Sequence, residues 1–170
     1  MSQIYFETEH FIIRQWKPQD LDPLYSIMSD DRVHTFTGDT TWSRERTQNY
    51  IDYMLERNFL TMEVFHGACI KKDTDQLIGL TGLNEYLPQQ PELEWQFGVE
   101  FWGKGYATEI GKAVIQHAFH SSNIRSIYGM ANPKNKASMR ALEKIGMICI
   151  GLQEFREHQD MFYRIDKNLV

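Results

Sequence analysis

The segment at residues 102–105 combines residue types and spacing that are suited to binding an anion. It reads Trp-Gly-Lys-Gly and is followed by residues with helical periodicity. Two glycines allow a tight turn with uncovered backbone N–H groups, and a helix start adds more N–H groups and the positive end of its dipole. Such a turn can hold a pyrophosphate. The same glycines are also compatible with a plain turn between a strand and a helix.

Known nucleotide motifs fit this segment poorly. A Walker loop needs Lys followed by Ser or Thr after a longer loop, whereas Lys104 is followed by Gly105. The dinucleotide fingerprint needs three glycines at its own spacing. A general nucleotide-phosphate binder is therefore the weakest of the functions considered.

Two carboxylates lie just upstream, in a segment that alternates with period two. Glu92, Glu94 and Gln96 share one face of residues 92–99, and apolar side chains occupy the other face. This pattern predicts a strand that runs into the glycine turn. Both acids are expected either beside a reacting group or as surface residues on a half-exposed strand.

The remaining elements must position these residues. The sequence predicts strands at 11–16, 62–71, 77–85, 92–99, 124–131, 147–155 and 161–168, and helices at 21–28, 43–58, 105–119 and 136–145. Residues 86–91 contain two prolines and are predicted to form a loop. This order predicts an α/β fold, with a mixed sheet and helices on both of its faces.

Composition limits the class of protein. The 170 residues are 42% hydrophobic and 24% charged, which indicates one globular domain spanning 1–170. A net charge of −5 argues against a nucleic-acid partner. We expect no membrane partner and a cytoplasmic location, because no signal peptide or spanning run is found. Cys69 and Cys149 are interpreted as buried free thiols.

A family resemblance becomes visible once the motifs are combined. Residues 101–109, Phe-Trp-Gly-Lys-Gly-Tyr-Ala-Thr-Glu, resemble the coenzyme A pyrophosphate loop of the GNAT superfamily of N-acetyltransferases, in its RimJ/RimL-like branch. Residues 132–138 and 142–147 resemble the second signature of that branch, and residues 7–20 resemble its opening strand. The match covers nearly the whole chain in the right order.

The resemblance implies a GNAT-like fold of about seven mostly antiparallel strands, splayed between strands 92–99 and 124–131. The arm of acetyl-CoA would thread this gap, bound by exposed backbone groups near Phe97 and Val99. Residues 103–108 would hold the pyrophosphate, and Asn135 and Ser138 would lie near the thioester. The full set implied in binding acetyl-CoA is Phe97, Val99, Gly103, Lys104, Gly105, Tyr106, Ala107, Thr108, Asn132, Asn135 and Ser138.

The expected catalytic residues are Glu92, Ser138 and Asn135. Acetyl transfer needs a neutral amine, and Glu92 aligns with the acidic residue that the family often carries, so it is the expected base, acting directly or through water. Glu94 stands where the family commonly has glycine. Leu142 replaces the tyrosine that is the usual proton donor, and Ser138 is the expected substitute. Its alternative role is a helix hydroxyl bonded to the preceding turn.

No metal site is expected. His117 and His120 are three residues apart on a helix, but no third ligand is in view, so both are interpreted as surface residues. Trp102 replaces the Arg or Gln that the superfamily has before the first glycine, and the mainly backbone contacts of the loop should tolerate it.

The leading hypothesis is an enzyme that acetylates a primary amine with acetyl-CoA as donor. The acceptor would be a protein N-terminus, as the branch suggests, or a small amine such as a polyamine, an amino acid or an antibiotic. A non-catalytic acyl-CoA-binding module is the alternative, motivated by Leu142. The chain is expected to be a monomer or a homodimer.

Overall fold

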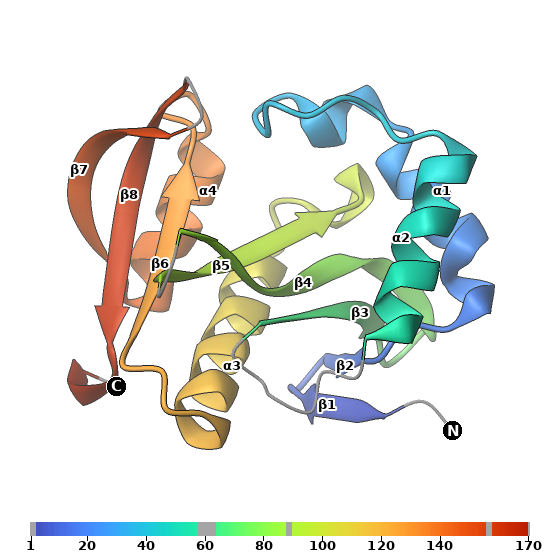
Figure 1. Ribbon diagram of the computed structural model, residues 1–170, viewed down its shortest axis with the longest axis horizontal. Helices are drawn as coiled ribbons and strands as arrows, with labels where there is room; N and C mark the ends of the chain where they lie inside the picture. Colours follow the sequence, from blue (N-terminus) through green and yellow to red (C-terminus); the bar gives the residue numbers. More distant parts are fainter. Residues whose placement is uncertain (1–2, 58–63, 88–89, 156–157, 170) are drawn as a thin grey trace.

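The computed structural model describes residues 3–57, 64–87, 90–155 and 158–169, which form one sheet flanked by α-helices (Figure 1). The strands are β1 (Ile4–Glu7), β2 (Phe11–Arg14), β3 (Phe65–Lys71), β4 (Gln76–Leu87), β5 (Gln90–Phe97), β6 (Ser126–Ala131), β7 (Ile148–Phe155) and β8 (His158–Asp166). The helices are α1 (Leu21–Met28), α2 (Arg44–Glu56), α3 (Tyr106–Ser121) and α4 (Lys136–Ile145).

The sheet parts between β5 and β6. Its order is β1-β2-β3-β4-β5-β6-β8-β7, and neighbouring strands are antiparallel except for β5 and β6. These two parallel strands share the register pair Glu92↔Tyr128 in the described chain, and Figure 1 shows their arrows diverging beyond it. The predicted mixed, mostly antiparallel sheet is therefore confirmed, and it opens toward the carboxyl ends of both strands.

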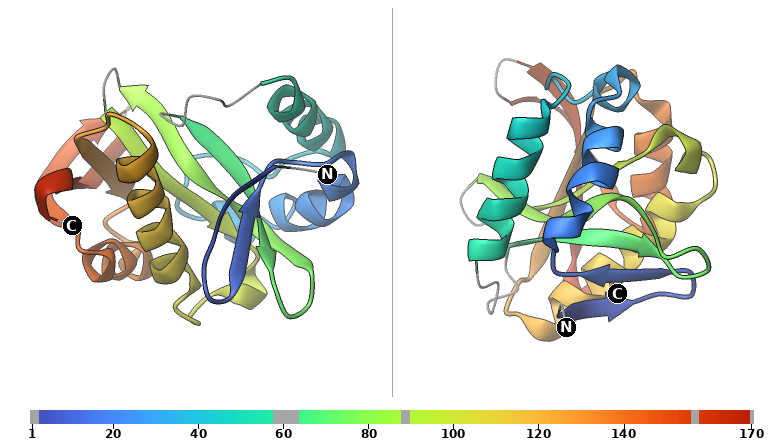
Figure 2. Two further views of the ribbon diagram at one scale, coloured as in Figure 1. Left: turned by 90° about the horizontal axis from the view of Figure 1, so that it is seen from below. Right: turned by 90° about the vertical axis from the view of Figure 1, so that its right-hand side faces the viewer.

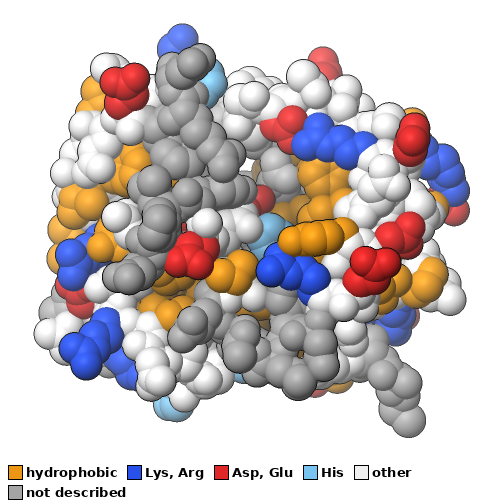
Figure 3. Space-filling model, viewed as in Figure 1, with side chains coloured by type: hydrophobic (Ala, Val, Ile, Leu, Met, Phe, Trp, Pro, Cys, Tyr) orange, Lys and Arg blue, Asp and Glu red, His pale blue; other side chains and the backbone are white. Residues whose placement is uncertain are grey.

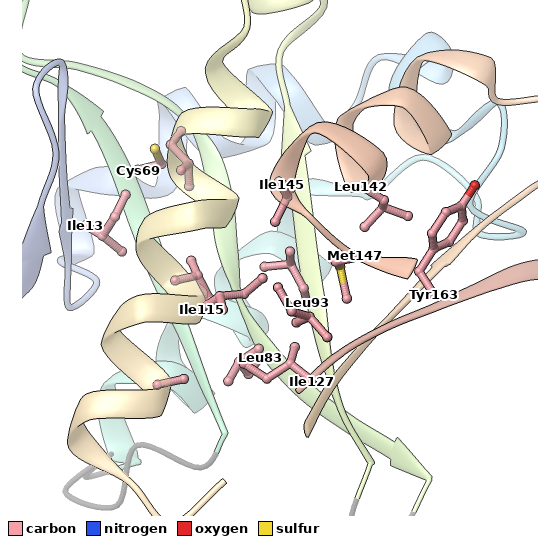
Figure 4. Packing of buried hydrophobic residues seen from close by; sticks show 14 of the residues in the cluster. Ile13, Cys69, Leu83, Leu93, Ile115, Ile127, Leu142, Ile145, Met147 and Tyr163 are labelled. Carbon is pink, nitrogen blue, oxygen red and sulfur yellow. The ribbon is translucent and has the colours of Figure 1, made fainter. Parts of the chain in front are cut away.

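The helices cover both faces of the sheet, as predicted. The right-hand view of Figure 2 shows α1 and α2 on one side and α3 and α4 on the other. Under α3 and α4 lies a large apolar core, part of which is shown in Figure 4, and it contains Leu93, Val114, Ile127 and Leu142. A second cluster under α1 and α2 includes Leu80.

Local sequence explains how α3 and α4 are fixed against this core. Ile110, Val114 and Ala118 recur at helical spacing and are buried against the sheet. A Cβ atom on Gly111 would lie 2.5 Å from Cδ1 of Ile145 in α4, so glycine permits the close approach of the two helices. The middle of α3 and the C-terminal end of α4 are thereby packed against each other.

The structure corrects several expected elements. The sheet has eight strands rather than seven in the described chain, because the four-residue β1 is too short and too exposed to give a clear pattern. The predicted loop 86–91 is wrong: β4 extends to Leu87 and β5 begins at Gln90, with 88–89 outside the described residues. Pro91 fits in β5 because the ladder with β4 runs through its neighbours Gln90 and Glu92.

Smaller differences concern segment ends and exposure. The helix predicted at 43–58 is α2, and residue 58 lies outside the described chain; the strand predicted at 62–71 is β3, and residues 62–63 are likewise not described. Cys69 is buried, and burial raises the pKa of its thiol, whereas Cys149 on the edge strand β7 is exposed, contrary to expectation. No helix among the described residues is long and apolar enough to span a bilayer.

Candidate active site

The glycine turn adopts the backbone conformation that an anion site requires. Gly103 and Gly105 have φ angles of +72° and +83°, in the left-handed region that favours glycine. A Cβ atom at either position would meet nothing within 4 Å, so the turn borders open space. Gly105 is the N-cap of α3, and its carbonyl accepts the amides of Thr108 and Glu109 at 3.1 Å each. The amides of Tyr106 and Ala107 stand at the helix start, where no intrahelical acceptor exists.

The start of α4 lies at the same edge of the sheet. Because β5 and β6 are parallel neighbours, the segments that follow them leave at one edge, and the helices α3 and α4 that they lead into pack against each other. The Asn135 side chain accepts the Ser138 amide at 3.1 Å and so caps α4, while the Asn132 side chain accepts the Lys134 amide at 2.9 Å. Both asparagines thus shape the turn that brings Ser138 to this edge.

Several exposed lysine and arginine side chains lie on α4 and just before it. They are Lys134, Lys136, Arg140 and Lys144. Glu109, the acid in the first turn of α3, is directed elsewhere: its carboxylate accepts the His10 amide at 3.0 Å and lies 2.9 Å from the ring Nδ1. Burial raises the pKa of Glu109, but hydrogen bonds from Thr8 and His10 outweigh it and keep the pKa below its ordinary value. Within residues 134–144 these four cations are accompanied by one acid, Glu143.

Backbone groups of β5 point into the gap, but two of the expected ones are already bonded. The amide of Gly98 bonds Ile78 in β4, so by alternation the groups of Phe97 point toward the gap. The Phe97 carbonyl accepts the Trp102 indole N–H at 2.8 Å, and the Val99 carbonyl accepts the Trp102 amide at 3.2 Å. Each of these two carbonyls therefore already accepts one hydrogen bond from Trp102. Trp102 instead ties the glycine turn to β5.

The two carboxylates of β5 differ in their environments. Glu92 is only 8% exposed and pairs in register with Asn84 on one side and Tyr128 on the other. Its alternative interpretation as a surface acid is therefore wrong. Glu94 lies two residues further along, where β5 has left β6, and its side chain is 23% exposed. Both side chains face α1 and α2, opposite Leu93, which lies in the core under α3.

His66 is a site residue that the sequence analysis did not identify. Its Nδ1 atom lies 3.1 Å from the Tyr50 hydroxyl of α2, and its Nε2 atom contacts the Asn84 side-chain oxygen and lies 4.0 Å from the Glu94 carboxylate. Figure 3 views this face of the molecule, where a histidine and acidic side chains are visible beside a hollow. The sequence gives one sign of this residue, because His66 is a polar side chain between Phe65 and the apolar end of β3.

Residue 142, where the family usually has a proton-donating tyrosine, is apolar in this chain. Leu142 is buried in the core, and a Cβ atom on Gly129 would lie 2.8 Å from its Cδ2 atom; Figure 4 shows it between α4 and the sheet. Leu142 therefore packs and transfers no proton. Ser138 donates its amide to Asn135, and its hydroxyl takes no part in that bond.

The two histidines of α3, His117 and His120, differ in their surroundings. No group of three possible ligands occurs in the described part of the chain. His120 is exposed, but His117 is half-buried, with its ring 4.9 Å from that of Phe6 and 6.2 Å from that of Phe65. The interpretation of His117 as a surface residue is wrong. Burial, and then the nearby His120, lower its pKa.

Comparison with known proteins identifies the family. The family described as Acetyltransferase (GNAT) domain matches residues 10–148. The chain belongs to the GNAT acetyltransferase family. Similar curated proteins include the uncharacterized N-acetyltransferases YnaD of Bacillus subtilis, 26% identical over 145 residues, and p20 of Bacillus licheniformis, 28% identical over 147 residues. The alignments cover 85% of this chain in both cases, and 82% and 83% of the two relatives.

Solved structures agree on the fold of this GNAT protein. A GNAT-family acetyltransferase from Bacillus anthracis superposes with a TM-score of 0.82 at 23% identity, covering 99% of both chains. An acetyltransferase from Agrobacterium tumefaciens gives 0.78 at 23% identity, covering 94% of this chain and 92% of that one. Fold, family and relatives together make the chain an N-acetyltransferase, which moves an acetyl group to an amine.

Proposed function

We propose that the acetyl donor is acetyl-CoA, with its pyrophosphate on residues 103–108 and its arm in the gap between β5 and β6. The observation that carries this proposal is the left-handed Gly105 at the start of α3, with open space where its Cβ would be. Helix-start amides and the positive dipole end suit a diphosphate there. The start of α4, with Asn132 and Asn135, would border the same ligand.

The chemistry requires a neutral amine beside the thioester and a proton for the departing thiolate. Glu92 is buried where β5 and β6 begin to part, and it would remove the amine proton directly or through water. The N–H of Phe97 points into the gap and would polarise the thioester carbonyl. The Ser138 hydroxyl would protonate the sulfur, with Asn135 holding the first turn of α4 in place.

The acceptor would be a primary amine, for which two sources are supported by different observations. A protein N-terminal α-amine agrees with the RimJ/RimL-like sequence motifs, and its pKa of about 7.7–8.0 makes it easier to deprotonate than lysine, at about 10.4. A ribosomal-protein-S5-alanine acetyltransferase from Vibrio fischeri shares the fold, with a TM-score of 0.78 at 17% identity.

A small polyamine is the second candidate, favoured by the acidic character of the face under α1 and α2. Glu92 and Glu94 lie there, and the cations Arg14 and Arg46 are matched by Asp20 and Asp39. A spermidine N-acetyltransferase from Vibrio cholerae, solved with CoA and spermine, shares the fold with a TM-score of 0.77 at 18% identity.

A paired substitution tests the donor site. Gly105→Ala places a Cβ atom in the proposed pyrophosphate space and strains a left-handed residue by about 1–2 kcal/mol. Gly151→Ala is the matched control, because Gly151 has a φ of +106° and equally open surroundings but lies on the edge strand β7. Calorimetric titration with coenzyme A should show affinity falling by about tenfold or more for Gly105→Ala alone, since only it removes ligand contacts.

Turnover separates an enzyme from a binding module. Thiol release from acetyl-CoA is measured with a panel of peptides and small amines. Acetylation of any amine supports the proposal, and tight coenzyme A binding without turnover on any amine supports the non-catalytic module. Equal loss of affinity in both glycine variants, or no binding at all by the wild type, would contradict the proposed donor site.

A further inference from the structure

Glu94 and His66 come from strands that are not neighbours, yet their side chains meet. In the register of the sheet, His66 of β3 lies opposite Gly82 of β4, and Gly82 lies opposite Glu94 of β5. Because Gly82 has no side chain, the two flanking side chains reach across β4, and Nε2 of His66 lies 4.0 Å from the Glu94 carboxylate. A Cβ atom on Gly82 would lie 1.8 Å from the Phe65 carbonyl oxygen, so this position accepts only glycine.

The imidazole of His66 is held from several sides. Tyr50 of α2 and Asn84 of β4 bond its two ring nitrogens. The Tyr50 ring is itself wedged between Trp16 and Trp42, at centroid distances of 5.5 and 5.1 Å. Such fixation leaves the imidazole little freedom and gives the Glu94 carboxylate a rigid neighbour.

Glu94 lies where β5 and β6 have parted. It lies beyond the register pair Glu92↔Tyr128, where β5 has already separated from β6. Its backbone carbonyl is fixed to β4 by the Thr81 hydroxyl at 2.9 Å, so its side chain extends from a rigid strand. At 23% exposure Glu94 is within reach of solvent, whereas Glu92 is buried.

We propose that Glu94 binds the ammonium form of the acceptor, and that the fixed imidazole of His66, 4.0 Å away, is the positioning residue that limits where the Glu94 carboxylate can lie. This inference rests on the proposed acetyl transfer and divides the work of the two acids: Glu94 binds the cation, and Glu92 removes the proton. It also names the acceptor class. A carboxylate at the entrance favours a primary amine that carries no acid near its nitrogen.

Matched substrates test the acceptor class. One pair is 1,4-diaminobutane and 4-aminobutyrate, which differ at one end only; the other is a tripeptide with lysine or glutamate as its second residue. The wild type should acetylate the cationic member of a pair with the higher kcat/KM. Glu94→Gln should raise KM for that member about tenfold with little change in kcat, because uniform binding is lost. Glu92→Gln should mainly lower kcat.

Variants of His66 separate positioning from folding. His66→Ala should raise KM like Glu94→Gln, and His66→Gln, which keeps a hydrogen-bonding side chain, should recover part of the loss. Glu154→Gln, which alters an exposed acid of β7, is the control and should behave as wild type. Circular dichroism and coenzyme A affinity check that each variant is folded.

These experiments distinguish a failure of the inference about Glu94 from a failure of the proposed acetyl transfer. If the wild type binds coenzyme A but acetylates no amine, the proposed acetyl transfer fails and this inference fails with it. If the wild type is active while Glu94→Gln keeps its KM and its preference for the cationic substrate, only the inference is overturned. A fall in kcat alone for Glu94→Gln would also overturn it, and would make Glu94 the base.

Discussion

The two faces of the sheet are built differently. Under α3 and α4 the core is almost entirely apolar, and the fully buried polar groups described there include Thr81 and the hydroxyl of Tyr163. Under α1 and α2 the described residues include the buried polar side chains Asp20, His34, Thr47 and Glu92. Burying such groups is costly unless each finds a partner. One face is therefore held by apolar packing, and the other also contains buried polar groups whose stability depends on their partners.

The difference agrees with the proposed division of ligands. The donor would meet the edge where α3 and α4 begin, and backbone amides there need only a rigid support behind them. The acceptor would approach the opposite face, where Tyr50 of α2 bonds His66 of β3 and His66 in turn bonds Asn84 of β4. Substitutions on the two faces should therefore differ in their effects on stability and on activity.

The largest loss of stability is expected on the polar face. The Arg14 guanidinium donates to both carboxylate oxygens of Asp20 at 2.8 Å, and both side chains are nearly buried. Asp20→Ala leaves Arg14 without its acid and should lower the free energy of unfolding by about 3–5 kcal/mol. Asp22→Ala, in an exposed pair with Arg44, should cost less than about 1 kcal/mol. Urea denaturation measures the free energy of unfolding of both variants. Equal losses would contradict the expected difference between the buried and the exposed ion pair.

A large-to-small change on the apolar face should cost nearly as much but spare activity per folded molecule. Ile115 is buried beneath α3, so Ile115→Ala should lower the free energy of unfolding by about 2–5 kcal/mol through a cavity. The control is Ile148→Ala, because Ile148 is exposed on the edge strand β7. A strong change in KM for the amine, measured well below the melting temperature, would show that the two faces are not separate.

The local features of the molecule could be predicted, and the long-range ones could not. The helix α3 and its glycine turn follow from residues adjacent in sequence. The strand β1 was missed because four half-exposed residues carry little pattern. The contact of His66 with Glu94 depends on strand register and on Gly82 between them, and no local spacing encodes it.

Exposure was the least predictable property of single residues. Glu92 and Glu94 alternate in the same way along β5, yet only Glu92 lies against β6 and is buried. His117 and His120 lie on one helix, but β1, which the pattern did not reveal, covers His117 through Phe6. Burial is set by which element packs on top, so it follows from the tertiary structure.

Moderate effects on stability and on coenzyme A affinity are expected at the start of α4. Asn135→Ala removes the cap on the Ser138 amide and should lower the free energy of unfolding by about 1 kcal/mol. Asn135→Asp keeps an acceptor and should preserve stability, but it adds a negative charge beside the proposed diphosphate and should weaken coenzyme A binding. Thermal melting and titration together separate the two roles. Unchanged affinity in Asn135→Asp would place the ligand elsewhere.

The smallest effect should be a pH dependence carried by His117 on the apolar face. Its pKa lies below the ordinary value of about 6.5, through burial and then through His120. Above that value both folded and unfolded states are neutral, and no stability is lost. As the pH falls below it, the unfolded chain binds the proton first, so stability declines until the pH passes the folded pKa.

Replacing the ring isolates this contribution. His117→Gln should melt with a shallower decline between pH 7 and pH 5 than the wild type, because it binds no proton in either state. His120→Gln removes only the weaker, electrostatic cause and should retain most of the decline. If His117→Gln declines as steeply as the wild type, His117 is solvated in solution. The packing of β1 over α3 would then be looser than the rest of the apolar face.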